Sequence, residues 1–398
     1  MGGRAYLNPG NSKKQIKDRV VPMAVAFLKK YATEPEFLAY CVKEEPRPRD
    51  LDKLEFYYKE LKKEVPSVKL YTIHHKVESA LLQGKPYPDI IGTDTYPFFY
   101  LDWLDVEMPT PRFSLEWYKR RCNQYWLATT FSKNVPMVVV FTGQPVWEYR
   151  LSGARFAKLP IKKQNKIRGF VKNKKLGWLY SKELDMYMRP SWYRAPQNCM
   201  RAMSWIAVME GAKMLFHWSW ANDIVMPKEK MFKKSFSLRI NDEQFNEYSM
   251  ACKTFRRFKE IILNMVKERI PLMECDDPFL FHRTHFLKGG KGTIQVLVNS
   301  DVGSWFGNQK NRFPKNGQVF SVDEKGGLVE YTPEKNKKKY EFSILKNREA
   351  RVWNLLEKRE LKPVIKAGVE VYSVELLPGD GTFLFTGSEK QYNELPVD

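Results

Sequence analysis

Two kinds of hydrophobic segment alternate over the first half of the chain. Short continuous apolar runs are separated by stretches with the three-to-four-residue apolar spacing of amphipathic helices. The runs predict strands at Phe37–Glu45, Val68–His75, Pro88–Phe98, Pro136–Pro145 and Lys213–Trp220. The stretches between them predict helices at Asp18–Tyr31, Asp50–Val65, Val77–Leu82, Ser114–Ser132 and Ala195–Glu210. Apolar strands that alternate with helices are typical of a parallel sheet covered on both faces.

This alternation predicts an α/β fold, and specifically a (β/α)8-type TIM barrel. Five strands are clear, Arg4–Gly10 is a candidate sixth, and a closed barrel needs eight. We therefore predict a barrel domain over 1–225 that lacks its first strands, which would lie upstream of this chain. A barrel that is incomplete in itself is the alternative.

The pattern changes in the second half of the chain. One apolar stripe over Asn241–Pro271 predicts a helix that closes the barrel and links the domains, within a linking segment 226–275. After Asp276, short strand patterns separated by Gly-rich and Pro-rich turns predict an antiparallel β-sandwich over 276–398. The basic run Lys335–Tyr340 is interpreted there as a solvated hairpin tip.

Charge adds a preference for acidic partners. The net charge is +21 and the pI is about 9.5, which favours nucleic acid, acidic lipid surfaces or acidic polysaccharide, unless the lysines only keep the protein soluble. No zinc-finger, P-loop or RNA-binding signature occurs, so nucleic acid is not expected. The strongly basic insert Arg150–Ser191 is predicted to be a long loop that shapes the substrate site, or else a solvated excursion.

Cysteine usage and apolar run lengths bear on the compartment. The five cysteines are odd in number, far apart and without metal-ligand spacing, which favours reduced thiols. There is no apolar run of 18 residues and the first residues do not resemble a signal peptide. We expect a cytoplasmic protein with no membrane partner and no cofactor, unless an upstream segment carries a signal.

Polar and aromatic residues collect where the predicted strands end. They are Glu44, Glu45, His74, His75, Asp94, Tyr96, Gln144, Trp218 and Trp220, with Trp147 and Glu148 following closely after Gln144. Because the carboxyl ends of parallel strands share one edge of the sheet, these side chains are expected to converge there, where such folds carry their active sites.

Three of these segments resemble barrel glycoside hydrolases. FLAYCVKEEPRPRDL is similar to the fourth-strand region, where a strand ends in an acidic pair and Pro, usually Asp-Glu-Pro. PDIIGTDTYPFF resembles a later strand that runs into Asp-x-Tyr-Pro, and RAPQNCMRAMSWIAVMEGAKMLFHWSW resembles the last helix and strand. The ordered resemblance covers Tyr31 to Asp223 and implies a carbohydrate substrate. A C-terminal sandwich is a common companion of such barrels.

Glycoside hydrolysis needs an acid for the leaving oxygen and a second group at the oxocarbenium-like centre. The resemblance assigns the acid to Glu45, with Glu44 or Asp94 orienting it or supplying the second charge. Alternatively, Glu44 and Glu45 are an acidic pair at a helix entry before Pro46.

One residue departs from the family pattern. Many retaining enzymes carry a nucleophilic Glu where this chain has Gln144, which cannot attack. Glu148 could substitute, or the substrate's acetamido group could attack, as in hexosaminidase families with an acidic pair on the fourth strand. The remaining interpretation is a non-catalytic protein that binds a carbohydrate or a polyanion on a degenerate glycosidase barrel.

The other strand-end residues are candidate sugar contacts. Side chains alternate along a strand, so one of His74 and His75 should face the site and the other the helices. Metal binding is not expected, because no third ligand lies near them in the sequence. Tyr96, Gln144, Trp147, Glu148, Trp218 and Trp220 complete the predicted substrate-binding set; core packing is the alternative for each aromatic residue.

Overall fold

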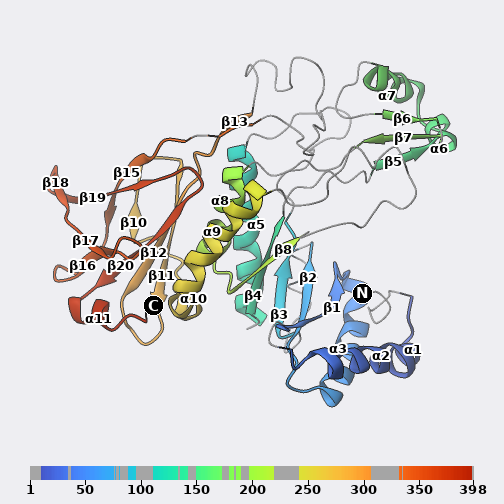
Figure 1. Ribbon diagram of the computed structural model, residues 1–398, viewed down its shortest axis with the longest axis horizontal. Helices are drawn as coiled ribbons and strands as arrows, with labels where there is room; N and C mark the ends of the chain where they lie inside the picture. The colour runs from blue at the N-terminus through green and yellow to red at the C-terminus, as the bar shows by residue number, and fades with distance from the viewer. Residues whose placement is uncertain are drawn as a thin grey trace. The chain divides into compact units, whose positions relative to one another are not determined.

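The computed structural model describes residues 10–34, 37–75, 77, 80, 88–95, 111–132, 135–141, 149–172, 179–182, 185–189, 197–218, 242–305, 331–333 and 335–396 (Figure 1). The chain forms two compact units. The first comprises Met1–Thr95, Lys119–Val139 and Glu210–Phe216; the second comprises Tyr96–Tyr118, Val140–Met209 and His217–Asp398. Each unit is described by itself.

A five-stranded sheet is the centre of the first unit. Its strands are β1 (Tyr40–Glu44), β2 (Leu70–His74), β3 (Ile90–Thr93), β4 (Val135–Phe141) and β8 (Met214–Trp218), in the order β1-β2-β3-β4-β8. The pairs β1–β2, β2–β3 and β3–β4 are parallel. Four of them lie within the strands predicted from the sequence, and β4 begins one residue before the predicted Pro136–Pro145. The described residues do not form a closed barrel, and the candidate strand Arg4–Gly10 lies outside them.

Helices precede, connect and follow these strands along the chain. They are α1 (Lys13–Gln15), the π-helical turn η1 (Ile16–Val20), α2 (Val21–Tyr31), the 3-10 turn η2 (Pro48–Asp50), α3 (Leu51–Glu64), α5 (Pro111–Ser132) and α8 (Gln197–Met209). Of the predicted helix Val77–Leu82, only Val77 and Ala80 lie within the described residues, and both are helical. The sheet therefore has the strand–helix alternation that the apolar pattern indicated.

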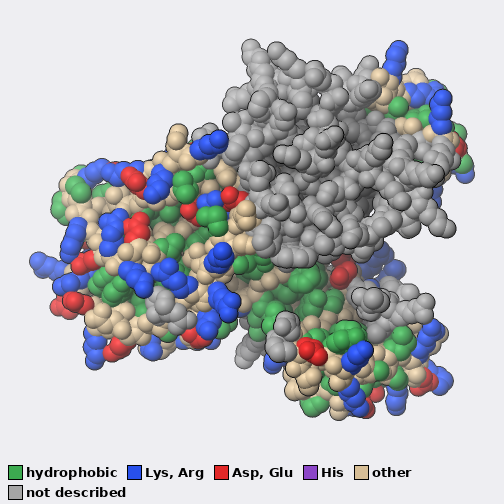
Figure 2. Space-filling model, in the orientation of Figure 1, with side chains coloured by type: hydrophobic (Ala, Val, Ile, Leu, Met, Phe, Trp, Pro, Cys, Tyr) green, Lys and Arg blue, Asp and Glu red, His purple; other side chains and the backbone are tan. Residues whose placement is uncertain are grey.

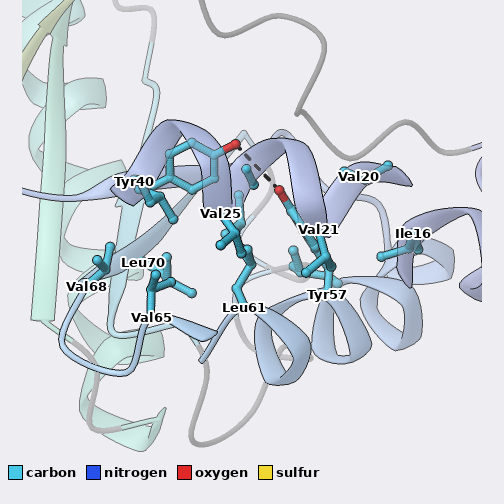
Figure 3. Close-up of a cluster of buried hydrophobic side chains, with 14 residues drawn as sticks. Ile16, Val20, Val21, Val25, Tyr40, Tyr57, Leu61, Val65, Val68 and Leu70 are labelled. Atoms are coloured by element: carbon cyan, nitrogen blue, oxygen red, sulfur yellow. Dashed lines mark hydrogen bonds between the residues drawn. The ribbon is translucent and has the colours of Figure 1, made fainter. Parts of the chain in front are cut away.

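The sheet of the first unit is apolar on both faces. On one face, α2 and α3 bury a cluster against β1 and β2, in which Leu28, Leu61 and Leu70 are fully buried (Figure 3). On the other face, Ile73 and Met137 belong to a second buried cluster. Because successive side chains of a strand point to opposite faces, Leu70 and Ile73 belong to different clusters.

Two antiparallel sheets make up most of the second unit. Their strands are β9 (Met265–Lys267), β10 (Met273–Glu274), β11 (Leu280–Leu287), β12 (Thr293–Asn299), β15 (Lys338–Ile344), β16 (Arg351–Asn354), β17 (Arg359–Leu361), β18 (Val364–Lys366), β19 (Val369–Leu376) and β20 (Gly381–Gly387). One sheet has the order β10-β15-β19-β18 and the other β17-β16-β20-β12-β11-β9. A shared buried cluster includes Phe342 and Tyr372 from the first sheet and Leu297 and Leu384 from the second. A short pair, β13 (Gly303–Trp305) with β14 (Tyr331–Pro333), and helix α11 (Glu389–Asn393) belong to the same unit.

The predicted helix Asn241–Pro271 extends too far at its C-terminal end. Helices α9 (Asp242–Arg257) and α10 (Lys259–Asn264) end before Met265, and β9 pairs with β11. Met265 and Lys267 are buried while Val266 between them is exposed, which is the two-residue period of a strand. The apolar stripe of the helix continued into this strand, so the stripe alone did not mark the end of the helix.

The solvated hairpin tip predicted at Lys335–Tyr340 is also wrong in its second half. Lys338 begins β15, and its ammonium lies 3.2 Å from Asp277, 3.1 Å from Asp301 and 4.3 Å from the centre of the Phe279 ring. Tyr340 is 1% exposed. A basic run can enter a strand when acidic and aromatic side chains from neighbouring loops contact it.

Candidate functional site

Three polar side chains meet at the carboxyl ends of neighbouring parallel strands. Glu45 follows β1, His75 follows β2 and Asp94 follows β3. One ligand atom from each, a carboxylate oxygen or a ring nitrogen, lies within 4.8 Å of the other two. The strand register places His75 beside Asp94, because His74 pairs with Thr93. Glu44 pairs with Ile73, so Glu45 lies one position short of His75 along the sheet.

A left-handed backbone turn places Glu45. Its φ is 44°, a conformation that is strained for a residue with a side chain, and its N–H donates a hydrogen bond of 2.7 Å to the carbonyl of Ile73. Pro46 follows and is buried, whereas Glu45 is exposed. The turn ends the strand and leaves the carboxylate at the sheet edge beside the other two groups.

Glu44 lies outside this three-residue cluster. A register shift between Cys41 and Lys43 pairs Cys41 with Tyr71 and Glu44 with Ile73, so Cys41 and Glu44 lie on the same face of the sheet. Burial, and then the negative charge of Glu44, raise the pKa of the Cys41 thiol to about 12. The charge of Glu44 therefore acts on the Cys41 thiol, which lies on the same face of the sheet.

The two histidines face opposite ways, as strand alternation predicts. His74 is fully buried and its Nε2 lies 3.1 Å from the Thr72 hydroxyl. The side chain of His75 is 48% exposed, and its Nδ1 lies 3.8 Å from a carboxylate oxygen of Asp94. His75 is therefore the one that reaches the cluster.

Asp94 is the most buried member of the cluster. It is 7% exposed, and its backbone N–H lies 3.4 Å from the carbonyl of His74. The hydroxyls of Thr93 and Thr95 on either side are buried and lie 2.9 Å apart. The cluster therefore combines an exposed carboxylate, a half-exposed imidazole and a carboxylate in dry surroundings, where charge interactions are stronger than in water.

Two side chains of helix α5 donate hydrogen bonds to the backbone at the end of β2. The Tyr125 hydroxyl donates a 2.6 Å hydrogen bond to the backbone carbonyl of His74, and the Arg121 guanidinium donates a 2.7 Å hydrogen bond to that of His75. The two side chains are one helical turn apart, and the guanidinium lies 5.6 Å from the centre of the Tyr125 ring. Sequence reasoning missed this pair; its only signal was the four-residue spacing on the helix that follows β3.

The same three side chains have the donor types that bind a divalent cation. Two carboxylates and one imidazole suit several metals. The sequence argument against a metal found no third ligand beside His74 and His75, but β1 and β3 supply the further donors in space. To share one ion, each ligand atom would have to move by less than the 4.8 Å within which the three now lie.

The remaining predicted substrate contacts are not positioned here. Tyr96, Gln144, Trp147, Glu148 and Trp220 lie outside the described residues, and Trp218 is the last residue of β8. The described part of the site therefore rests on three strands. No helix within the described ranges is both long and apolar enough to cross a membrane.

No family model and no curated protein matches the chain. Comparison with solved structures finds resemblances of low identity. A glycoside hydrolase is 8% identical with a TM-score of 0.46, over 95% of this chain and 70% of its own. A family 5 glycoside hydrolase from Bacteroides vulgatus is 8% identical with a TM-score of 0.45, over 97% and 68%. An α-L-arabinofuranosidase from Thermotoga maritima is 11% identical with a TM-score of 0.34, over 93% and 74%.

Proposed function

We propose that this protein is a glycoside hydrolase whose five-stranded sheet is part of a (β/α)-barrel. One observation carries the proposal: the carboxylates of Glu45 and Asp94 and the imidazole of His75 approach within 4.8 Å at the carboxyl ends of three successive strands. Paired acids at that edge are what hydrolysis of a glycosidic bond requires. A protein that only binds polyanions would have no need for two carboxylates at this separation.

Glu45 is the proposed general acid. Its carboxyl is exposed and therefore accessible to the leaving-group oxygen, and its strained turn keeps it at the strand end. Asp94 supplies the second charge, because it shares the cluster whereas Glu44 does not. The proposal therefore takes Asp94 and not Glu44, the two candidates for the second charge that the sequence left open.

His75 is the proposed sugar contact and proton relay. Its ring lies between solvent and Asp94, with Nδ1 3.8 Å from the carboxylate, so a small movement gives a hydrogen bond. The half-exposed ring is also within reach of a sugar hydroxyl from the solvent side. His74 has no such role in the proposal, because it is buried against Thr72.

The carboxylate separation favours retention of anomeric configuration. Retaining enzymes hold their two carboxyl groups about 5 Å apart, and inverting enzymes hold them about 6.5–9.5 Å apart to admit a water. One carboxylate oxygen of Glu45 lies within 4.8 Å of one of Asp94, which is closer to the first class than to the second. Attack by Asp94 and attack by a substrate acetamido group both give retention, so the spacing does not require a nucleophile at Gln144.

A screen of aryl glycosides, including N-acetylhexosaminides, tests the proposal. We expect at least one to be hydrolysed, with the first product in the same anomeric form as the substrate by NMR. Asp94→Asn should abolish this hydrolysis, whereas Asp52→Asn, an exposed aspartate on α3, should not. Binding of sugars with no turnover of any substrate would instead support a non-catalytic carbohydrate-binding protein. Turnover that requires an added divalent cation would assign the cluster to metal chemistry.

A further inference from the structure

The basic insert Arg150–Ser191 is a folded module within the residues that the structure describes. Strands β5 (Tyr149–Ser152), β6 (Leu179–Ser181) and β7 (Met186–Arg189) form an antiparallel sheet in the order β5-β7-β6. Helices α6 (Gly153–Ala157) and α7 (Ile161–Lys172) follow β5. The sequence predicted a long loop here; most of the basic residues that the structure describes instead lie on helices and strands.

Side-chain contacts make the module rigid. The Gln164 side chain is 9% exposed and donates hydrogen bonds to the carbonyls of Ala157 (3.1 Å) and Leu159 (2.8 Å), which locks α7 against the end of α6. The Phe156 ring stacks on that of Tyr187 with centres 4.0 Å apart. The backbone that carries the basic side chains therefore has little entropy to lose when a ligand binds.

One side of α7 is buried and the other carries positive charge. Gln164 and Ile167 form the buried side. The exposed basic residues of α6, α7 and their junction, which we call the basic face, are Arg155, Lys158, Lys162, Lys163, Lys166, Arg168 and Lys172. Figure 2 shows such Lys and Arg side chains over the described part of the insert. Lys162 and Lys166 are one helical turn apart and share the solvent side.

The positive charge of the insert has few acidic counterparts. The acidic residues within Arg150–Ser191 are Glu183 and Asp185, and Asp185 accepts a hydrogen bond from the Tyr180 hydroxyl. This excess of positive charge attracts anions to the basic face.

We propose that the basic face binds an anionic polysaccharide, a proposal that rests on the glycosidase function for its choice of polymer. The residues on it are mostly lysines, which act as point charges and suit carboxylated or sulfated sugars without a fixed geometry. Single-stranded nucleic acid stacks its bases on exposed aromatic platforms, whereas no aromatic residue of α6 or α7 is exposed and the exposed Tyr180 lies on β6. The substrate class is accordingly an acidic glycan.

Native affinity electrophoresis tests this binding without any need for turnover. The full chain runs through gels that contain polygalacturonate, heparin, dextran or no polymer, and fluorescent RNA is titrated in parallel. We expect retardation by the two anionic polysaccharides, no retardation by dextran, and loss of retardation with added salt. Replacement of Lys162, Lys163 and Lys166 by Gln should weaken binding about tenfold. The matched control replaces Lys288, Lys291 and Lys390, exposed lysines outside the insert, and should bind as the wild type does.

Each contrary outcome has a defined meaning. Equal weakening in the two triple variants, or no weakening in either, would overturn the basic face as the binding surface. Tighter binding of RNA than of either polysaccharide would overturn the choice of partner. Because binding is read without hydrolysis, an inactive protein that still binds through Lys162, Lys163 and Lys166 would refute the glycosidase proposal and leave this surface standing.

Discussion

The Tyr125 hydroxyl donates a 2.6 Å hydrogen bond to the backbone carbonyl of His74, one residue before the imidazole that approaches Asp94. The same carbonyl lies 3.4 Å from the N–H of Asp94, so it connects the ends of β2 and β3 to α5. Tyr125 is 3% exposed and does not belong to the three-residue cluster. Its contact sets the position of the backbone that carries His75.

Tyr125→Phe should therefore lower kcat by about tenfold while KM changes little, because misplacement of catalytic groups affects the transition state more than substrate binding. Tyr57→Phe is the matched control, since it also removes the hydroxyl of a buried tyrosine, one that contacts Tyr40 away from the cluster. Both variants should lose about 1 kcal/mol of unfolding free energy. An equal fall of kcat in both variants would reduce the contact to a general stabilising role.

The reactivity of the Cys41 thiol should depend on the negative charge of Glu44. A pKa of about 12 makes the thiolate rare near neutral pH, so alkylation of Cys41 should be slow although the residue is partly exposed. Glu44→Gln removes a negative charge that disfavours the thiolate, so the pKa should fall and alkylation should accelerate. Mass spectrometry of iodoacetamide-labelled peptides measures both rates, with Cys252 as the internal reference. An unchanged Cys41 rate would show that the two groups do not interact.

Two glycines should respond to alanine in opposite directions. Gly169 lies inside α7 with no atom within 4 Å of the position that a Cβ would take, so Gly169→Ala should stabilise the protein by about 0.5–1 kcal/mol. Gly379 has a φ of +77°, and a Cβ there would collide with the backbone carbonyl of Asn198. Gly379→Ala should cost more than about 1 kcal/mol. Thermal unfolding of both variants gives the signs.

Arg201 on α8 holds two acidic side chains in the second unit. Its guanidinium lies 2.6 Å from Glu247 and 3.3 Å from Asp380, and it is 8% exposed. Arg201→Met leaves two unpaired carboxylates and should lower the unfolding free energy by about 3 kcal/mol at neutral pH. Arg201→Lys, which keeps a positive charge, should lose less.

The loss in Arg201→Met should depend on pH in a defined direction. Burial raises the pKa of Asp380, and Arg201 opposes that rise. Without Arg201 the folded-state pKa is higher still, so the variant should be most stable below the ordinary pKa of an aspartate and lose stability as the pH rises through the raised value. Urea unfolding across this acidic range measures the effect. A loss that is independent of pH would show that the carboxylates are not its cause.

Most elements of this fold could be located from the sequence, because the patterns that mark them lie within single segments of the chain. Continuous apolar runs mark β1 to β4 and β8, and the side-chain alternation of a strand separated His74 from His75. Convergence of Glu45, His75 and Asp94 also followed, because parallel strands share one carboxyl edge. What the sequence did not predict depends on contacts between distant segments: the Arg121 and Tyr125 hydrogen bonds, the partners of Lys338, and the position of Glu44 outside the cluster of Glu45, His75 and Asp94.

The dependence of the Glu45→Gln variant on the leaving group tests the central claim most directly. A general acid protonates the departing oxygen, so its loss should cost about 10²–10⁴ in kcat/KM for a glycoside with an alcohol leaving group. A dinitrophenyl glycoside needs no such proton, and the same variant should cleave it at close to the wild-type rate. Glu44→Gln should retain activity on both. Equal losses on both substrates in Glu45→Gln, or a larger loss in Glu44→Gln, would contradict Glu45 as the general acid.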